Sequence, residues 1–377
     1  MELLNFDFDE RIERAETLPA RCYTDPAYLA LEQRQIFNRT WQLAGRLDQV
    51  SDPGSYFTAE VGDEPVIIVR GSDSELPQSL NAFHNVCRHR AGPVAQGAGR
   101  CDKFRCGYHG WTYATDGRLI GAPDFDGVER FNRDEFGLRP IQVQTWEQFI
   151  FIKLDGRANQ LSLLDMFEDI PTLTKHCRVP EMKFAERRDY VIDCNWKVYV
   201  DNYAEGYHVP IIHPSLMREL DFQQYRTITR RYYSLQDAPI KAGPEPAGAL
   251  RRRYSATAEQ NEALYFWVFP NLMLNIYPDN LSTNLIVPLG HDKTLTIFEW
   301  YFHDVESPAA KERIKATVEL SDEVQQEDIR ICEEVQKRLR SIAYDRGRYS
   351  VRRENGVHHF HSLWMEFMKA EPSTNKI

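Results

Sequence analysis

The spacing of apolar residues changes along the chain from a helical period to a strand period. Between residues 9 and 44, apolar side chains such as Tyr28, Leu31 and Ile36 recur at helical spacing, so we expect this stretch to be helical. From about Gly54, short apolar runs are separated by Gly, Pro and Asp, which is typical of the strands of a small β-sandwich.

A polar segment, "DGRANQ" at residues 155–160, follows these strands and is typical of a linker. Beyond it, "KFAERRDYVID" predicts a strand, "NWKVYVDNYAEGYH" predicts a helix, and strand-like runs continue as far as "TLTIFEWYF". Residues 307–342 have the apolar spacing of one long amphipathic helix. This order predicts an α+β fold in which a curved antiparallel sheet is closed by a long late helix.

The length of 377 residues exceeds that of a typical single domain, and 42% hydrophobic residues suffice to bury a substantial core. We therefore predict three parts. A helical segment at 1–44 packs on the last part, a β-sandwich occupies 45–155, and the α+β domain occupies 156–377.

The net charge of -10 disfavours a nucleic-acid surface, since phosphate binding needs clustered Lys and Arg. The short run "RRR" at 251–253 is predicted to be a solvated loop. The acidic start "MELLNFDFDERIERAE" does not resemble a secretory leader, and no run approaches the roughly 18 apolar residues of a membrane span. We expect a soluble, cytoplasmic protein that binds neither nucleic acid nor membrane.

Two close Cys/His pairs lie within the predicted sandwich: Cys87 with His89, and Cys106 with His109. Each pair offers one thiolate and one imidazole, whereas a zinc site usually takes two thiolates from one short motif. Two thiolates and two imidazoles from separate loops suit a 2Fe-2S cluster of Rieske type. The alternatives are a structural zinc or two unrelated pairs.

The motifs "CRH" at 87–89 and "CGYHGWTYATDG" at 106–117 resemble the Rieske domain of Rieske non-haem iron oxygenases. The same domain also occurs in electron-transfer proteins. Residues further along the chain must therefore distinguish an oxygenase from an electron carrier.

A second constellation lies within "DNYAEGYHVPIIHP", where His208 and His213 are five residues apart. On a continuous helix they would point about 140° apart, because each residue turns the helix by roughly 100°. Pro210 disfavours helical geometry before it, so we expect the helix to end there and the two imidazoles to converge on a metal. The alternative is a solvated polar stripe.

The long C-terminal helix supplies a candidate third ligand. Asp328 falls within its apolar stripe, and a carboxylate facing a core is costly unless a cation compensates it. Two histidines and one carboxylate form the facial triad of non-haem Fe(II) oxygenases, which leaves positions open for O2 and substrate. Glu327 is the rival ligand, and an Asp328 at the solvated edge of the stripe is the remaining alternative.

Together, the two constellations resemble an oxygenase alpha subunit over residues 40 to 342. The resemblance implies a Rieske domain followed by a helix-grip (START/Bet v1-like) catalytic domain, with His208, His213 and Asp328 on mononuclear Fe(II). It also implies a homotrimer in which the cluster of one subunit serves the iron of its neighbour.

The resemblance assigns a role to Glu205, three residues before His208. It implies that Glu205 links a ligand histidine to His109 of the partner subunit. Aromatic-ring dioxygenases of the family often have Asp there, whereas members that oxidise carnitine and glycine betaine have Glu. Asp201, where ring-hydroxylating relatives often have Asn, is a further catalytic candidate without a defined role.

Aromatic side chains could enclose a trimethylammonium group by cation–π contacts, stack on an aromatic substrate, or fill core. The candidates are Tyr203, Tyr207, Phe269 and Tyr277. Strand alternation is expected to aim Leu272, Leu274 and Ile276 to one side of the sheet beneath the iron.

The sequence lacks a Gly-rich dinucleotide fingerprint after any predicted strand, so a separate NAD(P)H-dependent reductase must supply electrons, directly or through a ferredoxin. We expect a terminal oxygenase that uses O2 to hydroxylate or demethylate a small quaternary ammonium or N-methyl compound. Oxidation of an aromatic acid is the alternative. An electron carrier and a lipid-binding module without metal ligands are more distant ones.

Overall fold

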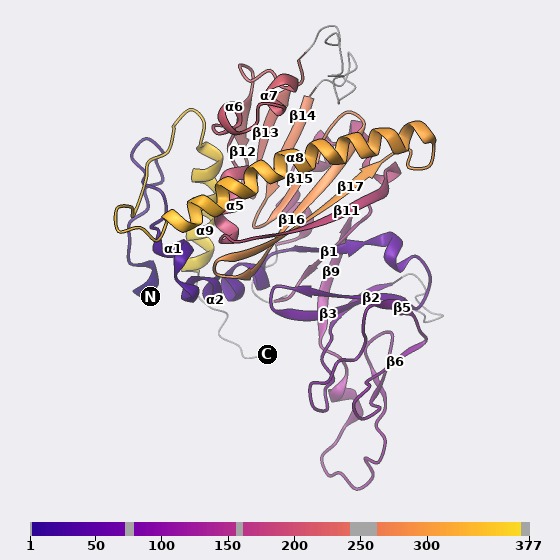
Figure 1. Cartoon of the computed structure of the whole chain (residues 1–377). Helices are drawn as coiled ribbons and strands as arrows, with labels where there is room; N and C mark the ends of the chain where they lie inside the picture. Colours follow the sequence, from indigo (N-terminus) through magenta and orange to yellow (C-terminus); the bar gives the residue numbers. More distant parts are fainter. Residues whose placement is uncertain (1, 72–78, 156–160, 242–261, 371–377) are drawn as a thin grey trace. The chain divides into compact units, whose positions relative to one another are not determined.

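The computed structural model describes residues 2–71, 79–155, 161–241 and 262–370 (Figure 1). The basic run 251–253 and most of the expected linker lie outside these residues. The chain divides into two compact units, one built mainly from Phe37–Leu163 and the other from Met1–Ile36 and Leu164–Pro372. The proposed boundaries near residues 44 and 155 stay a prediction.

The Phe37–Leu163 unit contains a seven-stranded sheet in the order β1-β10-β9-β4-β3-β2-β5 and a three-stranded sheet β6-β7-β8. The strands of the larger sheet are β1 (Gln42–Arg46), β2 (Ser55–Val61), β3 (Glu64–Arg70), β4 (Leu80–His84), β5 (Ala98–Arg100), β9 (Pro140–Trp146) and β10 (Phe149–Lys153). Those of the smaller are β6 (Lys103–Arg105), β7 (Thr112–Ala114) and β8 (Leu119–Gly121). Short 3-10 helices span Phe37–Arg39, Leu47–Val50 and Arg133–Phe136.

Strand β3 explains how this unit buries two cores. Its side chains alternate between the two faces of the sheet. Val66 and Ile68 join one buried cluster, whereas Ile67 and Val69 join the other, which also contains Cys87 and Cys106. The predicted cluster cysteines are therefore anchored in the hydrophobic interior of their own unit.

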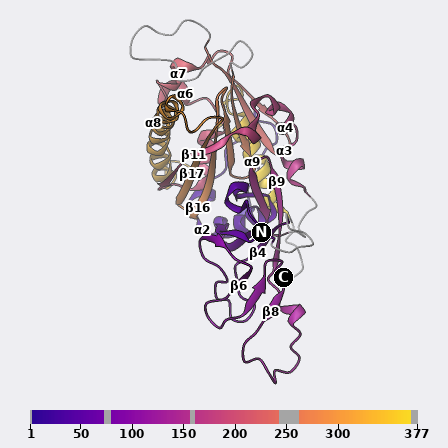
Figure 2. The same cartoon turned by 90° about the vertical axis from the view of Figure 1, so that its right-hand side faces the viewer.

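The other unit contains a seven-stranded antiparallel sheet in the order β11-β17-β16-β15-β14-β13-β12. Its strands are β11 (Lys183–Ile192), β12 (Arg226–Thr229), β13 (Tyr233–Pro239), β14 (Glu262–Val268), β15 (Leu272–Ile276), β16 (Asn280–Gly290) and β17 (Lys293–Phe302). Helix α8 (Pro308–Arg338) runs along one side of this sheet (Figures 1 and 2). Its residues Ile314 and Val318 pack against Phe298, Trp300 and Phe302 of β17. The predicted α+β fold, with a late helix covering an antiparallel sheet, is confirmed.

Shorter helices complete this unit. They are α1 (Arg21–Thr24), α2 (Pro26–Gln35), α3 (Leu163–Phe167), α4 (Ile170–Leu173), α5 (Trp196–Tyr203), α6 (Val209–Ile212), α7 (Leu216–Glu219) and α9 (Asn355–Lys369). Short 3-10 helices span Glu2–Leu4, Lys175–Cys177 and Val179–Glu181. No helix within the described part of the chain is both long and apolar enough to cross a lipid bilayer.

The expectation of a helix across residues 9–44 is only partly correct. Helix α2 begins at Pro26, where the side chain of Asp25 accepts a hydrogen bond from the Ala27 N–H and caps the helix. Gln42–Arg46 forms strand β1 instead of continuing the helix. Asp25 and Pro26 divide the stretch 9–44, because a capping residue and a proline at the first helical position both mark the start of a helix.

A fully buried ion pair ties three helices together. Lys197 in α5 donates to Glu32 in α2 at 2.6 Å, and neither side chain is exposed. The indole N–H groups of Trp196 and Trp364 also donate to Glu32, each at 2.7 Å, the latter from α9. The Lys197 ammonium lies 5.4 Å from the ring centre of Tyr23. Because the carboxylate is fully hydrogen-bonded, the buried charges are tolerated.

We expect Lys197→Met to destabilise the protein by about 3–5 kcal/mol, because it leaves the Glu32 carboxylate buried without its counter-ion. Chemical denaturation would measure the loss. The control is Lys337→Met, which breaks an exposed pair with Glu334 and should leave the stability close to that of the wild type. Equal effects of the two substitutions would contradict the assigned role of the buried pair.

Candidate active site

The two Cys/His pairs lie on two similar turns. The Cys87 N–H donates to the Gly92 carbonyl at 2.9 Å, and the Cys106 N–H donates to the Trp111 carbonyl at 2.9 Å. Both cysteines are buried, and the ring centres of His89 and His109 are 4.6 Å apart. The structure thus brings all four predicted cluster residues together within one unit.

The surroundings of these residues fit an iron–sulfur cluster. The His89 Nδ1 is buried without a hydrogen-bond partner among the described residues, as expected of an atom that needs a ligand. Burial and the neighbouring His109 lower the pKa of His89, which favours the neutral imidazole that metals bind. The Tyr113 hydroxyl lies 3.2 Å from the Cys87 Sγ and can donate to a thiolate.

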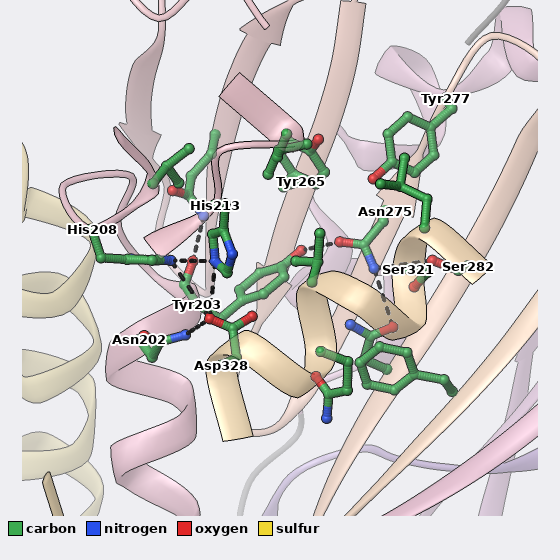
Figure 3. A pocket seen from close by; sticks show the side chains of 18 of the residues that line it. Asn202, Tyr203, His208, His213, Tyr265, Asn275, Tyr277, Ser282, Ser321 and Asp328 are labelled. Carbon is green, nitrogen blue, oxygen red and sulfur yellow. Dashed lines mark hydrogen bonds and ion pairs between the residues drawn. The ribbon is translucent and has the colours of Figure 1, made fainter. Parts of the chain in front are cut away.

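A second group of ligand atoms converges in the other unit (Figure 3). The Nε2 atoms of His208 and His213 are 3.1 Å apart, and the Asp328 Oδ1 lies 3.0 Å from the His213 Nε2 and 3.7 Å from the His208 Nε2. The donor atoms of these three residues all lie within 4.8 Å of one another, so they could hold one metal ion. Two imidazoles and one carboxylate are the donor set that non-haem Fe(II) takes.

Pro210 does not end a helix as expected, although the side chains of the two histidines do converge. Helix α5 already ends at Tyr203, and Pro210 lies in the first turn of the next short helix, α6. A proline is tolerated there because the first N–H groups of a helix have no partner within it. His208 precedes α6 and His213 follows it, so this single helical turn turns both side chains toward Asp328.

A carboxylate lies behind each of the two imidazoles. The Glu205 Oε1 is 2.6 Å from the His208 Nδ1, and the Glu327 Oε2 is 2.7 Å from the His213 Nδ1. Each carboxylate can hold a proton on Nδ1 and so leave Nε2 free to bind a metal. Although burial lowers the pKa of His213, its bonds to Asp328 and Glu327 raise the pKa overall.

Asp328, not the rival Glu327, therefore completes the three-residue group. The Asn202 Nδ2 donates to the Asp328 Oδ1 at 2.7 Å and orients this carboxylate. Sequence reasoning missed Asn202, because an Asn on a helix carries no signal of its own beside the more conspicuous Asp201.

Asp201 itself points elsewhere. Its Oδ1 lies 2.8 Å from the Nε2 of the buried His361, and its Oδ2 accepts from the Tyr23 hydroxyl at 2.7 Å. These partners come from α9 and α1. The structure thus places Asp201 in a network that joins helices, and does not bring it to His208, His213 and Asp328.

A cavity extends from the three candidate ligands between α8 and the sheet (Figure 3). Of the predicted aromatic residues, Tyr203 and Tyr277 line it. Tyr207 is 58% exposed instead, and Phe269 is buried against Phe367. Further aromatic residues that line the cavity, all missed from the sequence, are Tyr199, Tyr225, Tyr265, Phe298 and Trp300.

The cavity borders the side of strand β15 that carries Asn275. Leu272, Leu274 and Ile276 share one side of the strand, as alternation predicts. Because Asn275 points to the opposite side and lines the cavity, the three apolar side chains face away from the cavity. Ser282 and Asn284 of the neighbouring strand β16 line the cavity with Asn275.

Comparisons with known proteins agree with both sites. Residues 40–132 match the family model of the Rieske [2Fe-2S] domain, and residues 179–370 match that of the ring hydroxylating alpha subunit (catalytic domain). The 2Fe-2S cluster is the cofactor of the first domain and mononuclear iron is that of the second, and the chain contains both domains.

Individual relatives cover almost the whole chain. A chloroplastic choline monooxygenase from Arabidopsis thaliana is 37% identical over 95% of this chain and 84% of its own length. The carnitine monooxygenase oxygenase subunit of Escherichia coli K12 is 29% identical over 95% of both chains. A solved quaternary ammonium Rieske monooxygenase aligns with a TM-score of 0.84 and 26% identity over 96% of this chain and 98% of its own. The chain belongs to the Rieske oxygenases of the ring-hydroxylating alpha-subunit family.

Proposed function

We propose that this chain is the terminal oxygenase of a multicomponent system that oxidises a small quaternary ammonium compound. The observation that carries the proposal is a cavity with aromatic walls that opens directly onto His208, His213 and Asp328. A quaternary ammonium group cannot donate a hydrogen bond, so aromatic faces are its usual recognition element. The names of the relatives, choline and carnitine monooxygenase, support the same substrate class.

The residues around the three candidate ligands would act by orientation. Glu205 and Glu327 fix the tautomers of His208 and His213, and Asn202 holds Asp328. When bound, Fe(II) on such a set supplies open coordination positions for O2 beside the substrate. Tyr199 and Tyr225 are buried and Tyr203 is partly buried; removal from water raises the pKa of each, so their hydroxyls stay neutral in the cavity wall.

We further propose that Cys87, His89, Cys106 and His109 hold the cluster and that a partner subunit completes the electron path in a homotrimer. Tyr108, beside His109, is 59% exposed, and Tyr207 and Ile211, beside His208, are 58% and 80% exposed. Apolar side chains this exposed next to both metal sites are typical of interfaces. The solved structure of the related quaternary ammonium Rieske monooxygenase gave insight into electron transfer between the subunits of that protein. A separate reductase would reduce the cluster, since two relatives are named as oxygenase subunits.

The function can be tested by NADH-dependent O2 uptake with a surrogate reductase. We expect coupled product formation from choline, glycine betaine or carnitine. The uncharged choline isostere 3,3-dimethyl-1-butanol should be a poorer substrate, because it loses the cation–π contacts. Coupled turnover of aromatic acids alone would favour the alternative function and overturn this one.

The third iron ligand can be tested by metal analysis. The wild-type chain should hold about three irons and two acid-labile sulfides, and Asp328→Ala should hold about two of each, since the cluster is untouched. The matched control is Asp322→Ala on the same helix, where Asp322 accepts from Tyr190; it should keep all three irons. If Asp328→Ala retained the third iron, Asp328 would not be the ligand.

The two carboxylates behind the histidines provide a matched pair of variants. Glu327→Gln should lower iron affinity or activity by about 10–100-fold, as such supporting residues do. Glu205→Gln should abolish turnover even in protein loaded with both metals, because Glu205 is proposed also to link the two metal sites. Anaerobic reduction followed by cluster re-oxidation with substrate and O2 would measure the transfer. Equal rates of cluster re-oxidation in the two variants would show that Glu205 does not link the two metal sites.

A further inference from the structure

The charge distribution of the active-site cavity limits which quaternary ammonium compound it can accept. The charged side chains among the described lining residues are Glu205 and Asp328, both acidic, with the imidazoles of His208 and His213 beside them. No Lys or Arg contributes to this part of the wall. The remaining polar residues are neutral amides and hydroxyls.

A bound Fe(II) would not reverse this balance. One divalent cation faces the carboxylates of Asp328, Glu205 and Glu327, all within hydrogen-bond range of a ligand histidine. The group as a whole then keeps one negative charge. It favours a substrate with a net positive charge and offers no surplus positive charge to a substrate carboxylate.

The end of the cavity away from His208 is polar but electrically neutral (Figure 3). The Tyr203 hydroxyl donates to the Asn275 Oδ1 at 2.8 Å. The Asn275 Nδ2 donates to the Ser282 Oγ at 3.1 Å and to the Asn284 Oδ1 at 3.2 Å. All three β-strand residues are at least nine-tenths buried. Both donor hydrogens of Asn275 are therefore already engaged within the protein.

Such a network suits a hydroxyl group better than a carboxylate. A hydroxyl both donates and accepts, and its transfer from water costs little once it is hydrogen-bonded. A carboxylate only accepts, and its removal from water needs a paired cation or several free donors. The described wall carries no cation that could pair with a carboxylate, and the Asn275 amide is already engaged within the protein.

We propose that this cavity selects a quaternary ammonium alcohol, of the choline type, over carboxylated compounds such as glycine betaine and carnitine. The aromatic walls bind the trimethylammonium group, and the neutral polar residues accept an uncharged oxygen substituent. This inference rests on the proposed function, and it takes as the determinant of specificity the lack of a Lys or Arg among the described residues that line the cavity.

Binding to the iron-loaded protein without reductase and without O2 tests the proposal independently of turnover. Isothermal titration with choline, glycine betaine and carnitine should give a dissociation constant for choline at least about 10-fold lower than for the other two. Equal or tighter binding of either carboxylated compound would overturn this proposal and leave the proposed function intact. Failure of all three to bind would overturn the proposed function itself.

Adding a cation to the wall should reverse the preference. Ser321, on α8, lines the cavity and is only partly buried, so it can accept a longer side chain. We expect Ser321→Lys to shift the ratio of the glycine betaine and choline dissociation constants by about 10-fold or more toward glycine betaine. Ser321→Met, of similar length and uncharged, should leave the ratio near that of the wild type.

Asn284→Lys, compared with Asn284→Met, repeats the test from the sheet side of the cavity in case α8 tolerates no change. Retention of the third iron, held by His208, His213 and Asp328 of the same unit, verifies that this unit is folded in each variant. If the Met and Lys variants shift the ratio equally, size and not charge decides the selection, and the proposal is wrong.

Discussion

The buried contact between Lys197 and Glu32 is the constraint on which the active-site geometry depends. It fixes the first turn of α5 against α2 and α9. The last turn of the same helix carries Asn202 and Tyr203, and the turn after it carries Glu205. A helix of eight residues is too short to be stable alone, so its direction must come from tertiary contacts. This is why residues from the start of the chain belong to the same unit as the candidate iron ligands.

The site is assembled from two segments that lie more than a hundred residues apart. One supplies His208 and His213 on either side of a single helical turn, and the other supplies Asp328 and Glu327 on adjacent positions of α8. Adjacent residues on a helix point in directions about 100° apart. One carboxylate can therefore face the metal position while the other supports a histidine from behind. Two adjacent acidic residues on one helix can therefore both bind the metal and support a ligand histidine.

Residues with unusual chemistry at short spacing could be predicted from the sequence, whereas partners brought in by the fold could not. The Cys/His pairs and His208 with His213 needed only local spacing. The spacing argument reached the correct pair of histidines through an incorrect helix end, since Pro210 starts a helix. Asn275, Ser282 and Asn284 escaped detection because polar residues within a strand usually face solvent, and here α8 covers that face. Asp201 was a candidate because ring-hydroxylating relatives often have Asn there, and its contact with His361, 160 positions further along the chain, could not be inferred from the sequence.

The close packing of Gly356 extends the sensitive region of the protein well beyond its chemistry. A methyl group at this position would overlap the carbonyl oxygen of Ala204, the residue directly before Glu205. Gly356 does not line the active-site cavity and is not among the candidate metal ligands. Substitution of Gly356 should nevertheless inactivate the enzyme as substitution of a metal ligand does, because a larger residue there would displace the turn that positions Glu205. Loss of function at a glycine in α9 would then follow from a backbone contact made outside the active-site cavity.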